Sequence, residues 1–109
     1  MKTDKRLNAE IELCKLWINQ FTAPTVNFRH DRSSYGYKHN VERYFHTYIS
    51  NYAFKSATKE LGVKFKPDDP MGINEIYKLR VIPKFIEPMS KEYNEPADIL
   101  NLIISNKNK

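Results

Sequence analysis

The sequence predicts an α+β domain, and three observations support this prediction. Apolar residues recur at helical spacing in three segments of the first 61 residues. The second and third of these segments are separated by only a few residues, and an alternating apolar–polar pattern follows directly after the third. Two helices joined by a short turn and followed by a β-hairpin are typical of a winged helix-turn-helix domain. The sequence therefore predicts three N-terminal helices, a hairpin wing and a C-terminal helix.

The first predicted helix covers residues 5–21 and ends before Pro24, because proline disfavours helical geometry at the residue that precedes it. Residues 24–34 are polar and are expected to form an irregular link. The second predicted helix covers residues 35–48, with Ser33 or Ser34 available to cap its first turn.

The third predicted helix covers residues 51–61. Ser50 is a favourable N-cap, and Gly62 stands where helices commonly close in a left-handed turn. Residues 63–82 then alternate on both sides of a turn rich in proline, aspartate and glycine, which predicts an antiparallel hairpin.

A last helix is predicted over residues 95–105, with residues 105–109 as a disordered tail. The chain of 109 residues has the usual length of one domain, so residues 1–109 are expected to form a single winged-helix-like unit.

The charge of the chain is concentrated in its middle third. The net charge is +5, and residues 28–66 contain eight basic and three acidic residues. A localised basic surface favours a polyanionic partner, because each phosphate that it neutralises releases counterions. A solvated lysine-rich surface that keeps a small protein soluble is the alternative interpretation.

The third helix and the hairpin carry the side chains that suit DNA. One polar stripe of the helix is expected to enter the major groove, since amides and hydroxyls can bond base edges. The remaining cations are expected to hold phosphates. The predicted major-groove residues are Asn51, Tyr52, Lys55, Ser56 and Lys59, and the predicted phosphate contacts are Arg29, Arg32, Lys38, Lys64, Lys66, Lys78 and Arg80.

Catalytic chemistry is not expected. The three histidines and the single cysteine form no tight metal-binding motif, and the three glycines are isolated, so neither a metal site nor a phosphate loop nor another cofactor site is predicted. Cys14 lies on the apolar stripe of the first helix, which indicates a buried thiol. With one cysteine, no long apolar segment and a charged N-terminus, the sequence predicts a cytoplasmic protein without a membrane span.

Two central segments carry a resemblance. Ser34-Tyr35-Gly36-Tyr37-Lys38-His39 and Tyr48-Ile49-Ser50-Asn51-Tyr52-Ala53-Phe54, followed by Gly62, resemble small proteins of phages, plasmids and other mobile elements with a SYGxKH…YISNxAF pattern. The resemblance covers about a third of the chain, and Tyr52 stands where that pattern has glycine. It implies a mobile-element origin more than a mechanism.

The resemblance also suggests an alternative function. Some small phage proteins with DNA-binding folds inhibit host defence nucleases, as anti-CRISPR proteins do, and the acidic residues of the C-terminal third would suit the basic channel of a nucleic-acid enzyme. For the DNA-binding hypothesis, a homodimer formed through the first or last helix would match a two-fold DNA site.

Overall fold

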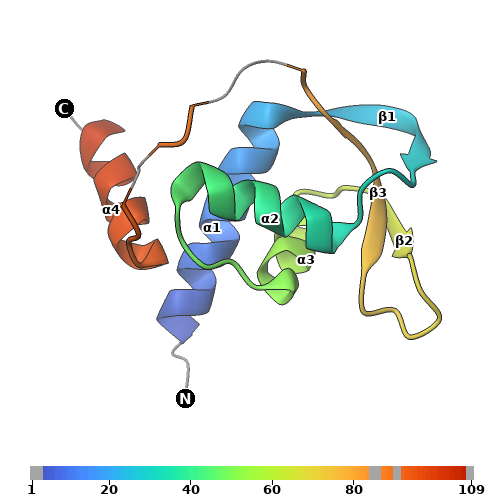
Figure 1. Cartoon of the computed structure of the whole chain (residues 1–109), viewed down its shortest axis with the longest axis horizontal. Coiled ribbons are helices and arrows are strands. Elements are labelled where there is room, and N and C mark those ends of the chain that lie inside the picture. The colour runs from blue at the N-terminus through green and yellow to red at the C-terminus, as the bar shows by residue number, and fades with distance from the viewer. Residues whose placement is uncertain (1–3, 84–86, 90–91, 108–109) are drawn as a thin grey trace.

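The computed structural model describes residues 4–83, 87–89 and 92–107, which contain both helices and strands (Figure 1). These residues form four helices and a three-stranded antiparallel sheet, so the predicted α+β class is confirmed. The elements are α1 (Asp4–Phe21), β1 (Thr22–Arg29), α2 (Ser34–Phe45), α3 (Asn51–Glu60), β2 (Phe65–Pro67), β3 (Glu75–Val81) and α4 (Pro96–Lys107).

The sheet has the order β1-β3-β2 and includes one strand that the sequence did not predict. Residues 24–34 were expected to be irregular, but β1 runs from α1 to Arg29 and pairs with β3. Thr22 is opposite Val81 and Pro24 is opposite Leu79, with an irregularity before Arg29. Proline is tolerated here because β1 is an edge strand. None of its residues is buried, so the strand shows no clear apolar alternation.

The turn between α2 and α3 begins earlier than predicted. The second helix was expected to reach residue 48, but it ends at Phe45 because His46 adopts a left-handed conformation with φ of 55°. Ser50 caps α3 as predicted, since its hydroxyl accepts a hydrogen bond from the Ala53 N–H at 3.0 Å. Gly62 has φ of 75° and closes α3 in the predicted left-handed turn.

The hairpin and the C-terminal helix are confirmed with adjusted bounds. β2 is a short strand of three residues, and β3 supplies the longer arm of the hairpin predicted over residues 63–82. The last helix continues through Lys107, so residues 105–107 are helical where a disordered tail was expected. Residues 108–109 of that tail lie outside the described residues.

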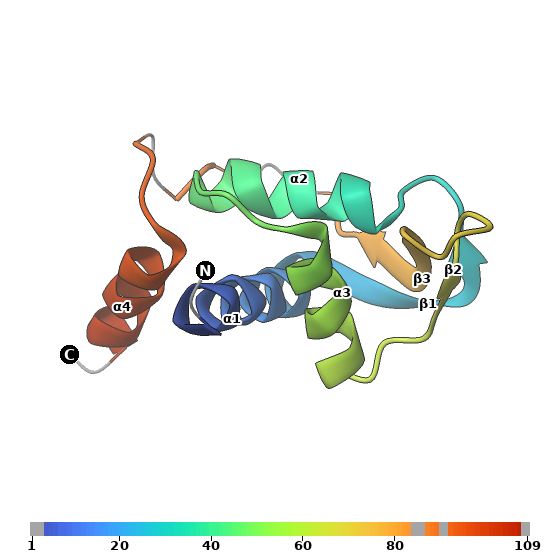
Figure 2. The ribbon, with the colours of Figure 1, turned by 90° about the horizontal axis from the view of Figure 1, so that it is seen from below.

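The core lies where α1, α2, α3 and β3 meet. Figure 2 shows the sheet at one end of the molecule and α4 at the other, with the three remaining helices between them. The rings of Tyr37 and Phe54 stack with centroids 5.2 Å apart, and Tyr77 meets both rings edge-on. Ala53 and Ala57 are fully buried, and their small side chains allow α3 to approach α1 closely.

One acidic residue of α1 is buried. The side chain of Glu10 is 2% exposed. Its carboxylate accepts a hydrogen bond from the Ser50 N–H at 2.8 Å and lies 3.5 Å from Arg6. Glu10 therefore ties α1 to the start of α3, and its spacing from Leu13 and Trp17 on the same helix was the signal for its burial.

Candidate nucleic-acid interface

The polar stripe of α3 divides into two parts. Tyr52 is 63% exposed, and Ser56 is half-buried. Asn51 and Lys55 are also half-buried, and Lys59, the last residue of the stripe, is exposed. The stripe is therefore exposed at Tyr52 and Lys59 and half-buried at Asn51, Lys55 and Ser56.

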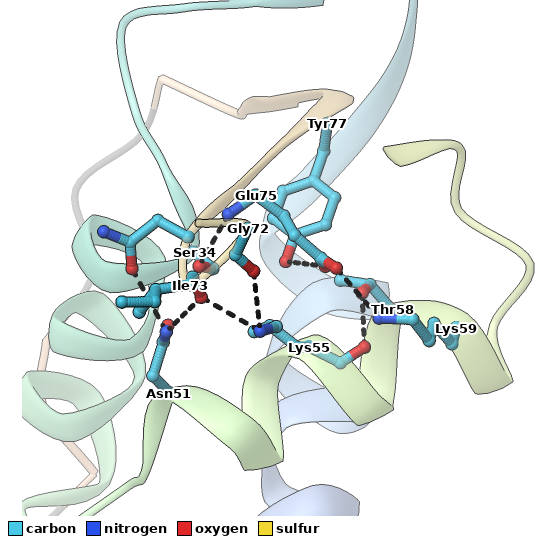
Figure 3. A network of polar contacts seen from close by, with 10 residues as sticks. Ser34, Asn51, Lys55, Thr58, Lys59, Gly72, Ile73, Glu75 and Tyr77 are labelled. Carbon is cyan, nitrogen blue, oxygen red and sulfur yellow. Dashed lines mark hydrogen bonds and ion pairs between the residues drawn. The ribbon is translucent and has the colours of Figure 1, made fainter. Parts of the chain in front are cut away.

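The half-buried part of the stripe contacts the loop between β2 and β3 (Figure 3). The Asn51 side-chain amide donates to the Ile73 carbonyl and to Asn74 Oδ1, both at 3.1 Å. The Lys55 ammonium donates to the carbonyls of Ile73 at 2.9 Å and Gly72 at 3.4 Å. These side chains fasten the loop to α3, so their N–H donors are largely used inside the protein.

The loop itself is held by Asp69. Its carboxylate accepts the backbone N–H groups of Ile73 at 3.1 Å and Asn74 at 3.0 Å. Backbone hydrogen bonds, those from Asn74 and Ile73 first, lower the pKa of Asp69 below its usual value, because they stabilise the charged form. The loop presents Met71 and Ile73 outward, and Met71 is 81% exposed.

The last lysine of the stripe contacts a buried carboxylate. Lys59 donates to Glu75 Oε2 at 3.0 Å, and the Tyr77 hydroxyl donates to Glu75 Oε1 at 3.1 Å. The Glu75 N–H donates to Ser34 Oγ at 3.1 Å, which joins the start of α2 to β3. Burial, together with the Glu75 charge, raises the pKa of Tyr77 far above its usual value, so this hydroxyl stays protonated and donates to Glu75.

The four hairpin cations that the sequence predicted as phosphate contacts lie together on one face of the sheet, which we call the outer face. Lys66 is opposite Ile76 in the ladder, and Lys78 and Arg80 follow Ile76 at steps of two, so all three project from the same side. Lys64 continues this row, because its carbonyl accepts the Lys78 N–H at 3.2 Å.

An aromatic ring stands among these cations. The ammonium groups of Lys66 and Lys78 lie 4.9 Å and 5.1 Å from the centroid of the Phe28 ring, which comes from β1. Within the described part of the chain, none of the four outer-face cations forms an ion pair. The outer face therefore concentrates positive charge that no described carboxylate neutralises.

The other three predicted phosphate contacts are placed differently. Arg29 pairs with Asp31 at 3.2 Å, and both are exposed. The Arg32 guanidinium lies 5.5 Å from the Tyr37 ring centroid. Lys38 is 8% exposed and pairs with Glu42 at 3.3 Å. The structure thus places Lys38 inside the protein, where a phosphate would not reach it without rearrangement.

The described residues do not bring together the groups of a metal centre, since no three or more histidine, cysteine or acidic side chains among them are placed to hold an ion. Cys14 is fully buried, as predicted, and burial raises the pKa of its thiol well above its usual value. None of the described helices is both long and apolar enough to cross a membrane.

The fold and its surfaces define a small α+β domain with a cationic sheet face. Comparisons of the chain with family models, with curated proteins and with solved structures gave no match.

Proposed function

We propose that the chain is a winged-helix domain that binds DNA, with the outer face of the sheet as its main phosphate-binding surface. The order helix, strand, helix, helix, hairpin, with β1 paired to β3, supports the winged-helix assignment. The observation that carries the proposal is the group of four cations beside Phe28, none of which forms an ion pair with a described residue: Lys64, Lys66, Lys78 and Arg80.

Electrostatics favours this surface over the stripe of α3. A cation whose hydrogen bonds are already made to carbonyls or a carboxylate must lose them before it binds a phosphate. Lys55 and Lys59 are in that position, whereas the outer-face cations are not. The stripe contributes Tyr52 and Ser56 to the DNA contact in this proposal, and the sheet supplies most of the charge.

The test is a DNA-binding titration at several salt concentrations. If all four outer-face cations contact phosphates, the logarithm of the binding constant should fall with the logarithm of salt with a slope of about −3 to −4. A Lys66→Glu, Arg80→Glu double variant should bind DNA roughly 100-fold more weakly. The slope of its salt dependence should be closer to zero by about 2.

The matched control is a Lys5→Glu, Arg43→Glu variant. It changes the net charge by the same amount at exposed positions on α1 and α2. Equal loss of binding in both double variants would reject the outer face as the DNA-binding surface, and the absence of salt-dependent binding in the native protein would reject the function.

A second function, inhibition of a host nucleic-acid enzyme, is favoured by the tip of the hairpin. Met71 and Ile73 are exposed on a loop that Asp69, Asn51 and Lys55 hold in one conformation. An ordered apolar tip suits a protein contact, because little entropy is lost when it binds.

This second function is tested by cleavage of DNA by a purified CRISPR nuclease in the presence of the protein. A Met71→Ser, Ile73→Ser variant should lose inhibition while it retains the salt-dependent DNA binding. Inhibition that follows the outer-face cations instead would indicate competition for DNA.

A further inference from the structure

An open pocket of about 710 Å³ lies beside the turn between α2 and α3, away from the outer face of the sheet. Side chains of the C-terminal half of α2, of the turn and of the segment before α4 line it. The segment is attached to the end of α2, since the Met89 N–H donates to the Tyr44 carbonyl at 2.7 Å and the Asn94 N–H to the His46 carbonyl at 3.3 Å. The volume is in the range of small-molecule sites.

One wall of the pocket carries basic side chains. His39 and Arg43 are four residues apart on one face of α2, and His46 follows directly after the end of the helix and lines the same pocket. The acidic side chain among the described lining residues, Glu42, is already occupied. It accepts hydrogen bonds from Lys38, from His39 and from the Ile49 N–H, at 3.3, 2.8 and 3.1 Å. The pocket therefore favours an anionic group.

Two exposed tyrosines supply aromatic surface at the same pocket. Tyr48 is 40% exposed and Tyr93 is 55% exposed, and the Tyr93 ring lies edge-on to His46 with centroids 6.5 Å apart. Exposed aromatic rings beside cations are the usual partners of planar ring systems such as nucleobases.

The turn between these walls carries a buried hydroxyl and a left-handed residue. Thr47 is 4% exposed and lines the pocket, but its hydroxyl has no hydrogen-bond partner among the described residues. His46 holds a left-handed backbone conformation that is uncommon outside glycine. Unsatisfied buried polar groups and backbone strain both occur preferentially at functional sites.

We propose that this pocket binds a nucleoside monophosphate, with the base against Tyr48 and Tyr93, the phosphate against Arg43 and the imidazoles, and the Thr47 hydroxyl bonded to the ligand. The site shares no residue with the outer face of the sheet, so it is independent of DNA binding.

The experiment is an NMR titration of the ¹⁵N-labelled protein with adenosine 5′-monophosphate, adenosine and inorganic phosphate. The monophosphate should produce saturable shifts at the Thr47 and Tyr48 amides with a Kd below about 1 mM, and each partial ligand should bind at least about tenfold more weakly. The absence of saturation by all three up to about 10 mM would overturn the proposal. Saturable shifts confined to Phe28 and Lys78 would also overturn it.

Three variants separate a ligand site from a structural turn. Arg43→Ala should weaken monophosphate binding about tenfold, as expected for loss of a charge-assisted hydrogen bond. His46→Asn keeps a residue that tolerates the left-handed conformation while it removes the imidazole, and it should also weaken binding. Thr47→Val should weaken binding without lowering the melting temperature, because the hydroxyl has no partner in the free protein.

The control is Arg80→Ala, which should weaken DNA binding and leave monophosphate binding unchanged. If Thr47→Val lowers the melting temperature and leaves monophosphate affinity unchanged, the hydroxyl is structural and the proposed site is wrong. If Arg80→Ala weakens monophosphate binding as much as Arg43→Ala does, the ligand binds the outer face and the pocket proposal fails.

Discussion

Two groups of lysines flank the hairpin, and they differ in what their ammonium groups contact. Lys55 and Lys59 on α3 donate to backbone carbonyls of the β2–β3 loop and to the buried Glu75. On the outer face, the ammonium groups of Lys66 and Lys78 lie near the ring of Phe28 and form no ion pair with a described side chain. The first group holds the hairpin against α3, and the second is available for a polyanion.

Lysines on the two sides of the hairpin therefore differ in role. A buried carboxylate and unpaired carbonyls need donors, so nearby lysines stabilise the fold. Where the sheet offers only apolar and cationic side chains, a lysine keeps its charge for solvent or a ligand. Substitutions on the two sides should therefore affect different measurements.

The largest effect on stability is expected from Glu75→Ala. This change removes the acceptor shared by Lys59 and the buried Tyr77 hydroxyl, which should lower the free energy of unfolding by about 3 kcal/mol. Urea denaturation measures it. Glu60→Ala is the control, since Glu60 pairs with Lys15 at the surface and its loss should cost less than about 1 kcal/mol. Equal losses would contradict the structural role of Glu75.

Lys55→Met should have the next largest effect. The carbonyls of Gly72 and Ile73 lose a charged donor, so the free energy of unfolding should fall by about 1.5 kcal/mol. DNA affinity, measured by fluorescence anisotropy, should change less than about twofold. A large loss of affinity in a protein of unchanged stability would place Lys55 in the DNA contact and break the comparison.

Lys78→Met should show the opposite pattern. The variant keeps the apolar stem beside Phe28 but removes the charge, so DNA affinity should fall roughly fivefold and the salt slope should move toward zero by about 1. The urea midpoint should stay within error of the native value. A shifted midpoint with unchanged affinity would assign Lys78 to the same structural role as Lys55.

The smallest effect is a pH dependence of the hairpin. The pKa of Asp69 is lowered in the folded protein, so its contribution to stability is present above the unfolded pKa of about 4 and is lost as pH falls through the folded pKa. Asp69→Asn should therefore flatten the decline of the urea midpoint below about pH 4. An identical decline in both proteins would show that other carboxylates cause it.

The sequence alone predicted the elements whose signals are local. Ser50 and Gly62 mark the two ends of α3 within a few residues of the helix, and the alternation on both sides of the Pro67–Gly72 turn marks the hairpin. The grouping of the hairpin cations on one face also followed from this alternation, because successive strand residues point to opposite sides.

Tertiary structure alone decided the rest, because the decisive contacts join residues far apart in the chain. β1 exists through its pairing with β3, and the burial of Glu10 depends on the Ser50 N–H, 40 positions away. Lys38 and Lys55 look like surface cations in the sequence, yet Glu42 and the hairpin loop engage them. Composition and spacing determined which residues carry charge, and packing determined which of those charges remain free.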